Sequence, residues 1–259
     1  ALGLNVKGLL NIQFAIKDEE LFILEANPRA SRTMPFVAKV TGNQIIKAGT
    51  LLMLGYSIDE VRNKTKYLSS SSNKVAIKKA IFPWSRFPAE DTMLGPEMKA
   101  TGEVLGVGKE FGTALNKAYA AAGVEINNKE KGIFVTLSDS EKPNFIKTVN
   151  KYLELGFTLY STEGTGKFLK TNGIDSVIVG KADDLGQTSL TIIEDKLVSL
   201  VINTPTYANE LSDGWKIRRL SHETGVAVVS SVREADAFIE AFLNQNLVLD
   251  DLEVIQDVS

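Results

Sequence analysis

Two blocks of hydrophobic patterning follow one another along this chain. In the first block, short apolar runs at residues 8–16 and 21–26 enclose a polar stretch at 17–20, a pattern typical of a β-hairpin with a polar turn. Residues 35–54 then carry apolar positions at helical spacing, with a break near Gly42. The remaining segments predicted for this block are a strand, an ordered loop and a helix, at residues 75–82, 87–110 and 111–122.

The second block alternates strand-like and helical patterns. Its strand-like runs lie at residues 133–137, 158–160, 176–179, 198–202 and 226–229. Its helical patterns lie at residues 143–155, 166–171, 189–195 and 233–243. Such alternation predicts a parallel, Rossmann-like sheet with covering helices. We therefore expect an α/β protein that divides at the polar stretch 125–131, with domains at residues 1–124 and 125–259.

Composition narrows the classes of function. The chain has 259 residues, a formal net charge of −3 and 44% hydrophobic residues, which is ordinary for a globular protein. The mild acidity gives no reason to expect nucleic acid or a membrane as partner. The absence of cysteine excludes disulfides, thiolate metal sites and a cysteine nucleophile. The opening run lacks an initiator Met, so we expect a piece of a longer protein, with N-terminal processing as the alternative.

One face of the predicted hairpin collects side chains that carry oxygen atoms. A turn centred between residues 18 and 19 places Gln13 opposite Glu25. Because side chains alternate faces along a strand, Asn27 points the same way as Glu25, and Asn11 the same way as Gln13. Amide and carboxylate oxygens suit Mg²⁺, which proteins hold with one or two carboxylates plus substrate phosphates. This face is therefore a candidate metal site.

Two arginines, Arg29 and Arg32, follow this face directly. Their guanidinium groups suit phosphate or carboxylate oxygens, and arginines and metal ions together offset the charge that moves in phosphoryl transfer. These residues indicate half of a site for magnesium-bound ATP. The alternative, which alternation alone leaves open, is a solvated polar face on an edge hairpin with two surface arginines.

Three strings of residues carry a family resemblance. The strings at residues 8–16 (GLLNIQFAI) and 24–33 (LEANPRASRT) resemble the ATP-grasp domain of the carbamoyl phosphate synthetase large-subunit family. The string at residues 94–104 (LGPEMKATGEV) resembles a second signature of that family. Asn-Pro-Arg alone is shared with several ligases, and the longer strings narrow the match. The resemblance covers essentially the whole chain.

This resemblance implies a fold and a set of roles. Residues 1–124 would be the C-terminal part of an ATP-grasp domain, in which Gln13, Glu25 and Asn27 hold the Mg²⁺ or Mn²⁺ of the C-terminal ATP site. Arg29 would be a catalytic residue that contacts the nucleotide phosphates while carbamate is phosphorylated to carbamoyl phosphate. The partners would be the rest of the large chain and a glutaminase small subunit, in the cytoplasm.

The resemblance also sets two limits. The family's glycine-rich ATP loop and adenine-binding residues would precede residue 1, so we expect no synthetase activity from this chain alone. At Lys79, some family members carry a glutamate for the activator ornithine. Because a lysine repels the ammonium group of ornithine, we do not expect ornithine to activate this protein.

The second block contains a candidate phosphate site. The turn at residues 161–166 (STEGTG) follows a predicted strand and opens a predicted helix, where hydroxyls and free N–H groups can hold a phosphate. Lys142, Lys181 and the pair Asn203-Thr204 follow other strands, and the carboxyl ends of parallel strands line one crevice. Ordinary helix capping and solvated surface lysines are the alternatives.

This half of the chain resembles the methylglyoxal-synthase-like domain that forms the allosteric end of the same large subunit. The resemblance implies binding of UMP or IMP, with UMP affinity in the micromolar range. Its ligand contacts would be Lys142, Thr162, Thr165, Lys181, Asn203 and Thr204. Pro205 replaces a threonine of the family, which leaves the nucleotide preference open.

Two other functions remain open at this level. One is a free-standing nucleotide-binding regulatory module without catalysis, and the other is methylglyoxal synthase itself. The enzyme needs a histidine near its phosphate site. His222 is the single histidine of this chain, and it falls in a helical stretch at residues 215–224, away from that position. We expect His222 to cap the helix or face solvent.

Overall fold

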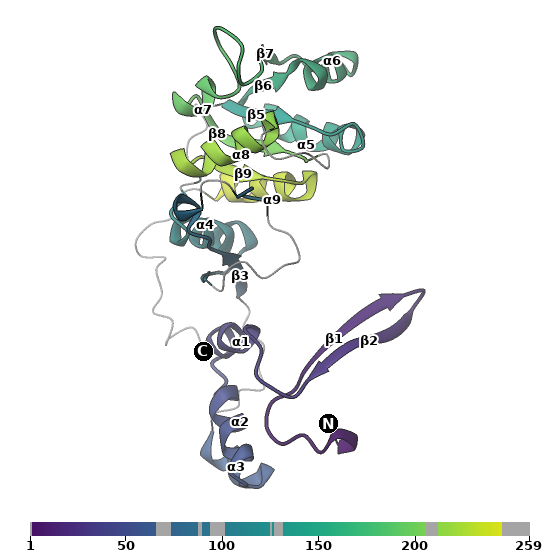
Figure 1. Ribbon diagram of the computed structural model, residues 1–259, viewed down its shortest axis with the longest axis vertical. Helices are drawn as coiled ribbons and strands as arrows, with labels where there is room; N and C mark the ends of the chain where they lie inside the picture. The colour runs from purple at the N-terminus through teal and green to yellow at the C-terminus, as the bar shows by residue number, and fades with distance from the viewer. Residues whose placement is uncertain are drawn as a thin grey trace. The chain divides into compact units, whose positions relative to one another are not determined.

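The structure, a computed structural model, describes residues 2–65, 74–87, 90–93, 102–124, 126, 132–205 and 212–244. Most of the string at 94–104 and of the polar stretch at 125–131 lies outside these residues. Packing divides the described chain into two compact units between Lys74 and Val75, and each is described by itself below (Figure 1). The predicted domain division at residues 124 and 125 stays a prediction.

The first unit opens with the predicted hairpin. Strands β1 (Asn11–Lys17) and β2 (Glu20–Asn27) are antiparallel, and Gln13 lies opposite Glu25. Asp18 and Glu19 form the two-residue turn, with φ of 51° and 64°. Positive φ at both turn residues matches the twist of the flanking strands, which explains the tight connection. The predicted register is confirmed at the positions that matter for the site.

Three helices complete the first unit. They are α1 (Thr33–Thr41), α2 (Ile45–Met53) and α3 (Ile58–Lys64), after the short 3₁₀ turn η1 (Leu2–Leu4). Gly42 ends α1 with φ of 67°, so the predicted break is confirmed. Helix α3 was not predicted, although the Ser57 side chain and Glu60 form a capping box at its start.

A five-stranded parallel sheet forms the centre of the second unit, in the order β7-β6-β5-β8-β9. Its strands are β5 (Gly132–Thr136), β6 (Thr158–Thr162), β7 (Val177–Val179), β8 (Val198–Asn203) and β9 (Ala227–Val229). Its helices are α5 (Lys142–Glu154), α6 (Glu163–Thr171), α7 (Thr191–Glu194), α8 (Asp213–Thr224) and α9 (Val232–Leu243). The predicted parallel α/β pattern is confirmed.

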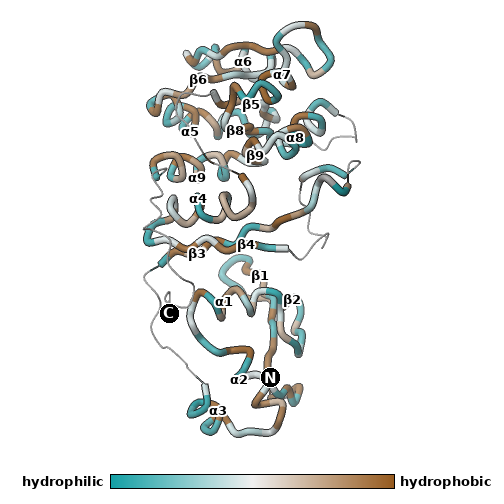
Figure 2. Tube along the Cα trace, turned by 90° about the vertical axis from the view of Figure 1, so that its left-hand side faces the viewer, coloured by the Kyte–Doolittle hydropathy of each residue, from teal (hydrophilic) through white to brown (hydrophobic). Residues whose placement is uncertain are grey.

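The core of this unit lies on both faces of the sheet. Phe145, Tyr152 and Phe238 pack on one face, in a cluster that includes side chains of α5 and α9. Ile192 of α7 and Ile217 of α8 pack on the other face. Figure 2 shows hydrophobic residues concentrated along the central strand β5. Because both faces are covered, β8 is buried along its whole length, and four of its six residues are apolar.

A second antiparallel pair, β3 (Val75–Ala80) and β4 (Glu103–Gly108), belongs to the same unit with the 3₁₀ turn η2 (Trp84–Arg86) and α4 (Phe111–Ala121). The predicted loop at residues 87–110 is wrong where β4 forms. The strand was missed because glycines weaken a strand pattern. A Cβ on Gly106 would come within 2.5 Å of the Ala118 nitrogen of α4, so a glycine at this position lets α4 pack closely on β4.

Helix α4 packs against α9 (Figure 1). The Asn116 amide of α4 donates hydrogen bonds to the Ala241 and Asn244 carbonyls, at 2.7 Å and 2.8 Å. The structure thereby joins residues before and after the predicted domain division in one packed unit. Within the described residues, no helix has the length and apolar character needed to cross a membrane.

Candidate functional site

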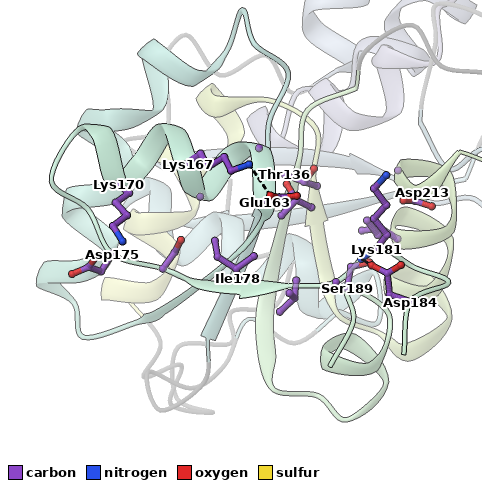
Figure 3. Close-up of a pocket in the computed structure, with 18 residues that line it drawn as sticks. Thr136, Glu163, Lys167, Lys170, Asp175, Ile178, Lys181, Asp184, Ser189 and Asp213 are labelled. Carbon is purple, nitrogen blue, oxygen red and sulfur yellow. Dashed lines mark hydrogen bonds and ion pairs between the residues drawn. The ribbon is translucent and has the colours of Figure 1, made fainter. Parts of the chain in front are cut away.

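A cleft of about 760 Å³ opens at the carboxyl edge of the five-stranded sheet (Figure 3). Thr136 and Thr162, the last residues of β5 and β6, contribute to its lining. Gly164 of α6, Lys181 after β7 and Asp213 of α8 line it as well. Parallel α/β sheets bind ligands at this edge, so the position agrees with the predicted crevice.

The first turn of α6 can receive an anion. Thr162 is the N-cap residue, and its side chain makes no capping hydrogen bond to the described first turn. The N–H groups at the start of a helix lack intrahelical partners and carry partial positive charge. A Cβ placed on Gly164 would meet no heavy atom within 4 Å, so the backbone is open on this side. This turn therefore offers N–H donors to a phosphate group.

Charges of both signs line the cleft: Lys167, Lys170 and Lys181, with Glu163, Asp175, Asp184 and Asp213. Lys181 is exposed, and its backbone N–H donates to Asp184 Oδ2 at 2.7 Å. Glu163 pairs with Lys167 at 2.6 Å, and this hydrogen bond, with the positive charges of Lys167 and Lys181, lowers the pKa of Glu163 (Figure 3). Because Lys167 takes up the Glu163 carboxylate, its negative charge is partly offset near the phosphate position.

Two other predicted ligand contacts, Thr165 and Thr204, are not among the residues that line the cleft. Thr165 and Thr204 are buried, and their hydroxyls accept hydrogen bonds from the backbone N–H groups of Leu137 and Ser138, at 3.1 Å and 2.7 Å. These bonds hold the connection between β5 and α5 beside the cleft. A direct contact of Thr165 or Thr204 with a ligand stays a prediction.

Lys142 and Asn203 are also engaged within the protein. The Lys142 ammonium lies 2.6 Å from Asp139 Oδ1, at the start of α5. Asn203 ends β8 and is buried, and its Oδ1 accepts a hydrogen bond from Arg218 at 2.7 Å. Thr162 and Lys181 are thus the two predicted residues that the structure brings to the cleft lining, while ligand contacts of Lys142 and Asn203 stay predictions.

Sequence reasoning missed part of the lining. Asp213, Gly214 and Ile217 come from the first turns of α8, and Ser189 comes from the connection between β7 and α7. The Ser189 nitrogen donates to the Gly180 carbonyl at 3.0 Å, which places Ser189 next to Lys181 in space. The signal that marks Asp213 is its place directly after the N-cap Ser212.

His222 does not line this cleft. It lies in the last turn of α8, and its ring packs 5.6 Å from the ring of Trp84, so the prediction that it caps the helix or faces solvent is wrong. Burial, with the nearby charges of Lys79 and Arg219, lowers the pKa of His222 to about 4. A neutral, packed imidazole at this place gives no support to a catalytic role.

Lys79 of β3 packs against Tyr119 of α4. Its ammonium sits 4.0 Å from the centre of the Tyr119 ring, a cation–π contact. Burial lowers the pKa of Lys79, against the opposing charge of Glu234. The expectation that ornithine does not activate this protein stays a prediction.

The hairpin of the first unit gathers the predicted metal ligands. Gln13 Nε2 and Asn27 Nδ2 both donate to Glu25 Oε1, at 2.6 Å and 2.8 Å. Arg29 is exposed after β2, where its Nη1 donates to the Ala30 carbonyl at 3.1 Å. The three predicted ligands therefore meet at one face of the hairpin, as the alternation of side chains indicated.

The chemistry of this donor set fits a cation that arrives with its phosphates. It holds one carboxylate and two amides, and each amide can turn to present its oxygen. Mg²⁺ is held in this way, with few protein carboxylates and oxygens of a bound nucleotide. Among the described residues, no cluster of three or more acidic or histidine side chains could hold a metal ion by itself.

Comparison with known proteins finds a matching protein family for part of each unit. Residues 1–61 match the family described as carbamoyl-phosphate synthase L chain, ATP binding domain, and residues 144–230 match the MGS-like domain family. The carbamoyl phosphate synthase large chain, C-terminal section, of Aquifex aeolicus is 38% identical in an alignment of 255 residues, gaps included, that covers 93% of this chain and 47% of that protein.

Two further relatives agree. The corresponding section of Methanocaldococcus jannaschii is 38% identical in an alignment of 249 residues that covers 93% of this chain and 40% of that protein. The carbamoyl phosphate synthase large chain of Brucella suis is 41% identical in an alignment of 249 residues that covers 93% of this chain and 21% of that protein. The chain spans less than half the length of these relatives. By these matches, the chain belongs to the carbamoyl phosphate synthase large-chain family and corresponds to its C-terminal section.

Proposed function

We propose that this chain acts in an ATP-dependent carbamoyl phosphate synthase, together with the rest of the large chain and a glutaminase small subunit. The observation that carries the catalytic part is the meeting of Gln13, Glu25 and Asn27 on one face of the hairpin. Mg²⁺ or Mn²⁺, when bound with ATP, neutralises charge on the phosphates during transfer.

The protein groups have separate tasks in this proposal. Glu25 supplies the one full negative charge toward the cation, and Gln13 and Asn27 hold its carboxylate in place by donating to the same oxygen, Oε1. Arg29, exposed just beyond the strand, is free to turn its guanidinium group toward the nucleotide phosphates. In this arrangement the hairpin positions the phosphoryl group, and carbamate is the acceptor in the proposed reaction.

The catalytic proposal is tested in the complete enzyme. We expect Glu25→Gln to lower ATP-dependent carbamoyl phosphate formation at least about tenfold and to raise the Mg²⁺ concentration required, since loss of metal-site groups costs this much or more. Glu20→Gln is the matched control, because Glu20 pairs with Lys17 at the far end of the hairpin. An unchanged rate and Mg²⁺ requirement in Glu25→Gln would contradict the proposal.

We propose further that the second unit binds a nucleoside monophosphate, UMP or IMP, as a regulator of the enzyme. The cleft volume of about 760 Å³ is large enough for such a ligand. The open first turn of α6 supplies N–H donors for the phosphate, and Lys181 supplies a positive charge at the same edge. Asp213 of α8, which lies beside Lys181 (Figure 3), can accept hydrogen bonds from ribose hydroxyls.

Isothermal calorimetry on the folded chain tests this second proposal. We expect UMP or IMP to bind with micromolar affinity. Lys181→Met should weaken binding about tenfold to a hundredfold, as expected for a charge-assisted contact. Lys196→Met, at an exposed position outside the cleft lining, is the control and should leave affinity unchanged. Absence of heat with both nucleotides would refute the proposal.

A further inference from the structure

Helix α8 contributes to the cleft and also to a second contact region. Asp213, Gly214 and Ile217 line the cleft. Arg218 and Arg219 follow immediately, and their side chains are only 4% and 7% exposed. Because a buried guanidinium group is costly unless it is paired, the partners of these two arginines are structurally important.

Arg218 joins two segments that are far apart in sequence. Its Nε and Nη2 donate to the two carboxylate oxygens of Asp91, with 2.9 Å from Nε to Oδ1. Its Nη1 donates to Asn203 Oδ1 at 2.7 Å. A planar guanidinium group held on two sides in this way has one well-defined position.

The Asp91 carboxylate is held as an anion in this contact. Burial works to raise its pKa, but the hydrogen bond and charge of Arg218, with the N–H groups of Thr92 and Met93, bring the pKa below its usual value. The Asp91–Arg218 pair is therefore ionised at neutral pH. Breaking it leaves a buried charge without a partner, which is strongly unfavourable.

Arg219 binds the same segment through its backbone. Its Nη1 donates to the Phe87 carbonyl at 2.6 Å, and its Nη2 donates to the Trp84 carbonyl at 2.8 Å. Together the two arginines make four hydrogen bonds to residues between Trp84 and Asp91. These residues lie between β3 and β4, in the part of the chain that precedes the predicted domain division.

The cleft wall and the arginine contacts are separated by a single helical turn. A Cβ on Gly214 would lie 3.2 Å from Arg218 Nη1 and 3.5 Å from Asn203 Nδ2. The guanidinium group therefore packs directly beneath the turn that lines the cleft. Since the turns of a hydrogen-bonded helix move together, a shift of Gly214 on ligand binding must carry Arg218 with it or strain its bonds.

We propose that α8 couples the occupancy of the cleft to the described residues 84–87 and 90–93, through the network formed by Asn203, Arg218 and Asp91. The inference rests on the proposed binding of a nucleoside monophosphate. Arg218 is a positioning residue in this scheme, since it touches the wall of the site rather than the ligand. Hydrogen-bond networks between packed side chains are one of the ways in which proteins couple two regions, and the hydrogen-exchange experiment below tests whether this one does.

Hydrogen exchange read by mass spectrometry tests the coupling. With UMP as the probe, we expect amide exchange in residues 84–93 of the folded chain to change on binding. In Asp91→Asn this change should be lost, while UMP affinity by calorimetry stays within about threefold of the parent, since Asp91 does not line the cleft. Arg233→Gln, an exposed arginine on α9, is the control and should keep both affinity and response.

The outcomes separate the two proposals. If UMP binds but exchange at 84–93 does not change, the coupling is refuted and nucleotide binding stands. If Asp91→Asn keeps the full response, the network is refuted as the route. If Asp91→Asn fails to fold, the double variant Asp91→Asn, Arg218→Gln replaces it, because no buried charge then lacks a partner. If neither UMP nor IMP binds to the parent chain, both the proposed nucleotide binding and the proposed coupling are refuted.

Discussion

Two glycines in the first half of α6 give a direct test of the phosphate position. Gly164 and Gly166 both line the cleft. A Cβ on Gly164 would meet no heavy atom within 4 Å, whereas a Cβ on Gly166 would overlap Ile178 Cδ1 and come within 2.7 Å of Ser161 Oγ. The same substitution to alanine should therefore have opposite effects on folding at the two positions.

The magnitudes follow from helix propensity and packing. Gly164→Ala should raise the free energy of unfolding by up to about 1 kcal/mol, because alanine favours the helix over glycine. Gly166→Ala should lower it by about 1–3 kcal/mol, the usual cost of adding a methyl group to filled space. The new methyl group at position 164 enters the space beside the first-turn N–H groups. We expect it to weaken UMP binding at least about tenfold, as expected for the loss of one phosphate hydrogen bond.

Urea unfolding and calorimetry with UMP measure the two effects on the same proteins. Thr171→Ala is the control, because it also raises helix propensity but lies at the far end of α6, outside the cleft lining. It should leave UMP affinity unchanged. If Gly164→Ala gains stability and still binds UMP as tightly as the parent, the phosphate does not lie at this helix start.

Three other predictions concern the stability of the second unit. The buried Ser189 hydroxyl has no hydrogen-bond partner among the described residues. Ser189→Ala should therefore raise the free energy of unfolding in urea by about 1 kcal/mol. A loss of stability would show that the hydroxyl is paired. Tyr152 donates to the Ala235 carbonyl at 2.5 Å, so Tyr152→Phe should lower the free energy of unfolding by about 1–2 kcal/mol in the same assay. His222 stays neutral in the folded chain down to its pKa of about 4, whereas the unfolded chain binds a proton below about pH 6.5. The free energy of unfolding should therefore fall as the pH drops through this window, by about 1–2 kcal/mol at pH 5 relative to pH 7. His222→Gln should remove this part of the loss. Equal pH dependence of stability in the parent chain and in His222→Gln would contradict the assignment.

Much of the fold could be predicted because its signals are local. The polar stretch at 17–20 marked the hairpin, and strand alternation brought Gln13 and Glu25 together, as the structure confirms. The strand β4 was missed because Gly106 and Gly108 weaken its pattern, and their use depends on a helix that packs on them. Helix α3 could have been found, since Ser57 and Glu60 have capping-box spacing.

The candidate site was predictable only in part. Thr162 and Lys181 were found because Thr162 ends β6 and Lys181 follows β7, and strand ends of a parallel sheet share one edge. Asp213 was missed because it comes from a helix that closes the cleft from another side. That contribution depends on how α8 packs on the sheet, which residue spacing does not encode.

The sequence by itself determined the parallel α/β pattern, the hairpin and the edge of the sheet at which a ligand would bind. These features depend on side-chain periods of two and about 3.6 residues and on neighbours in the chain. Only the tertiary structure decided which polar side chains at that edge face the cleft. Thr165 and Thr204 hold backbone N–H groups, and Arg218 binds Asp91 127 residues away. The physical reason is that a buried donor or acceptor must find a partner in space, and packing decides which partner is near.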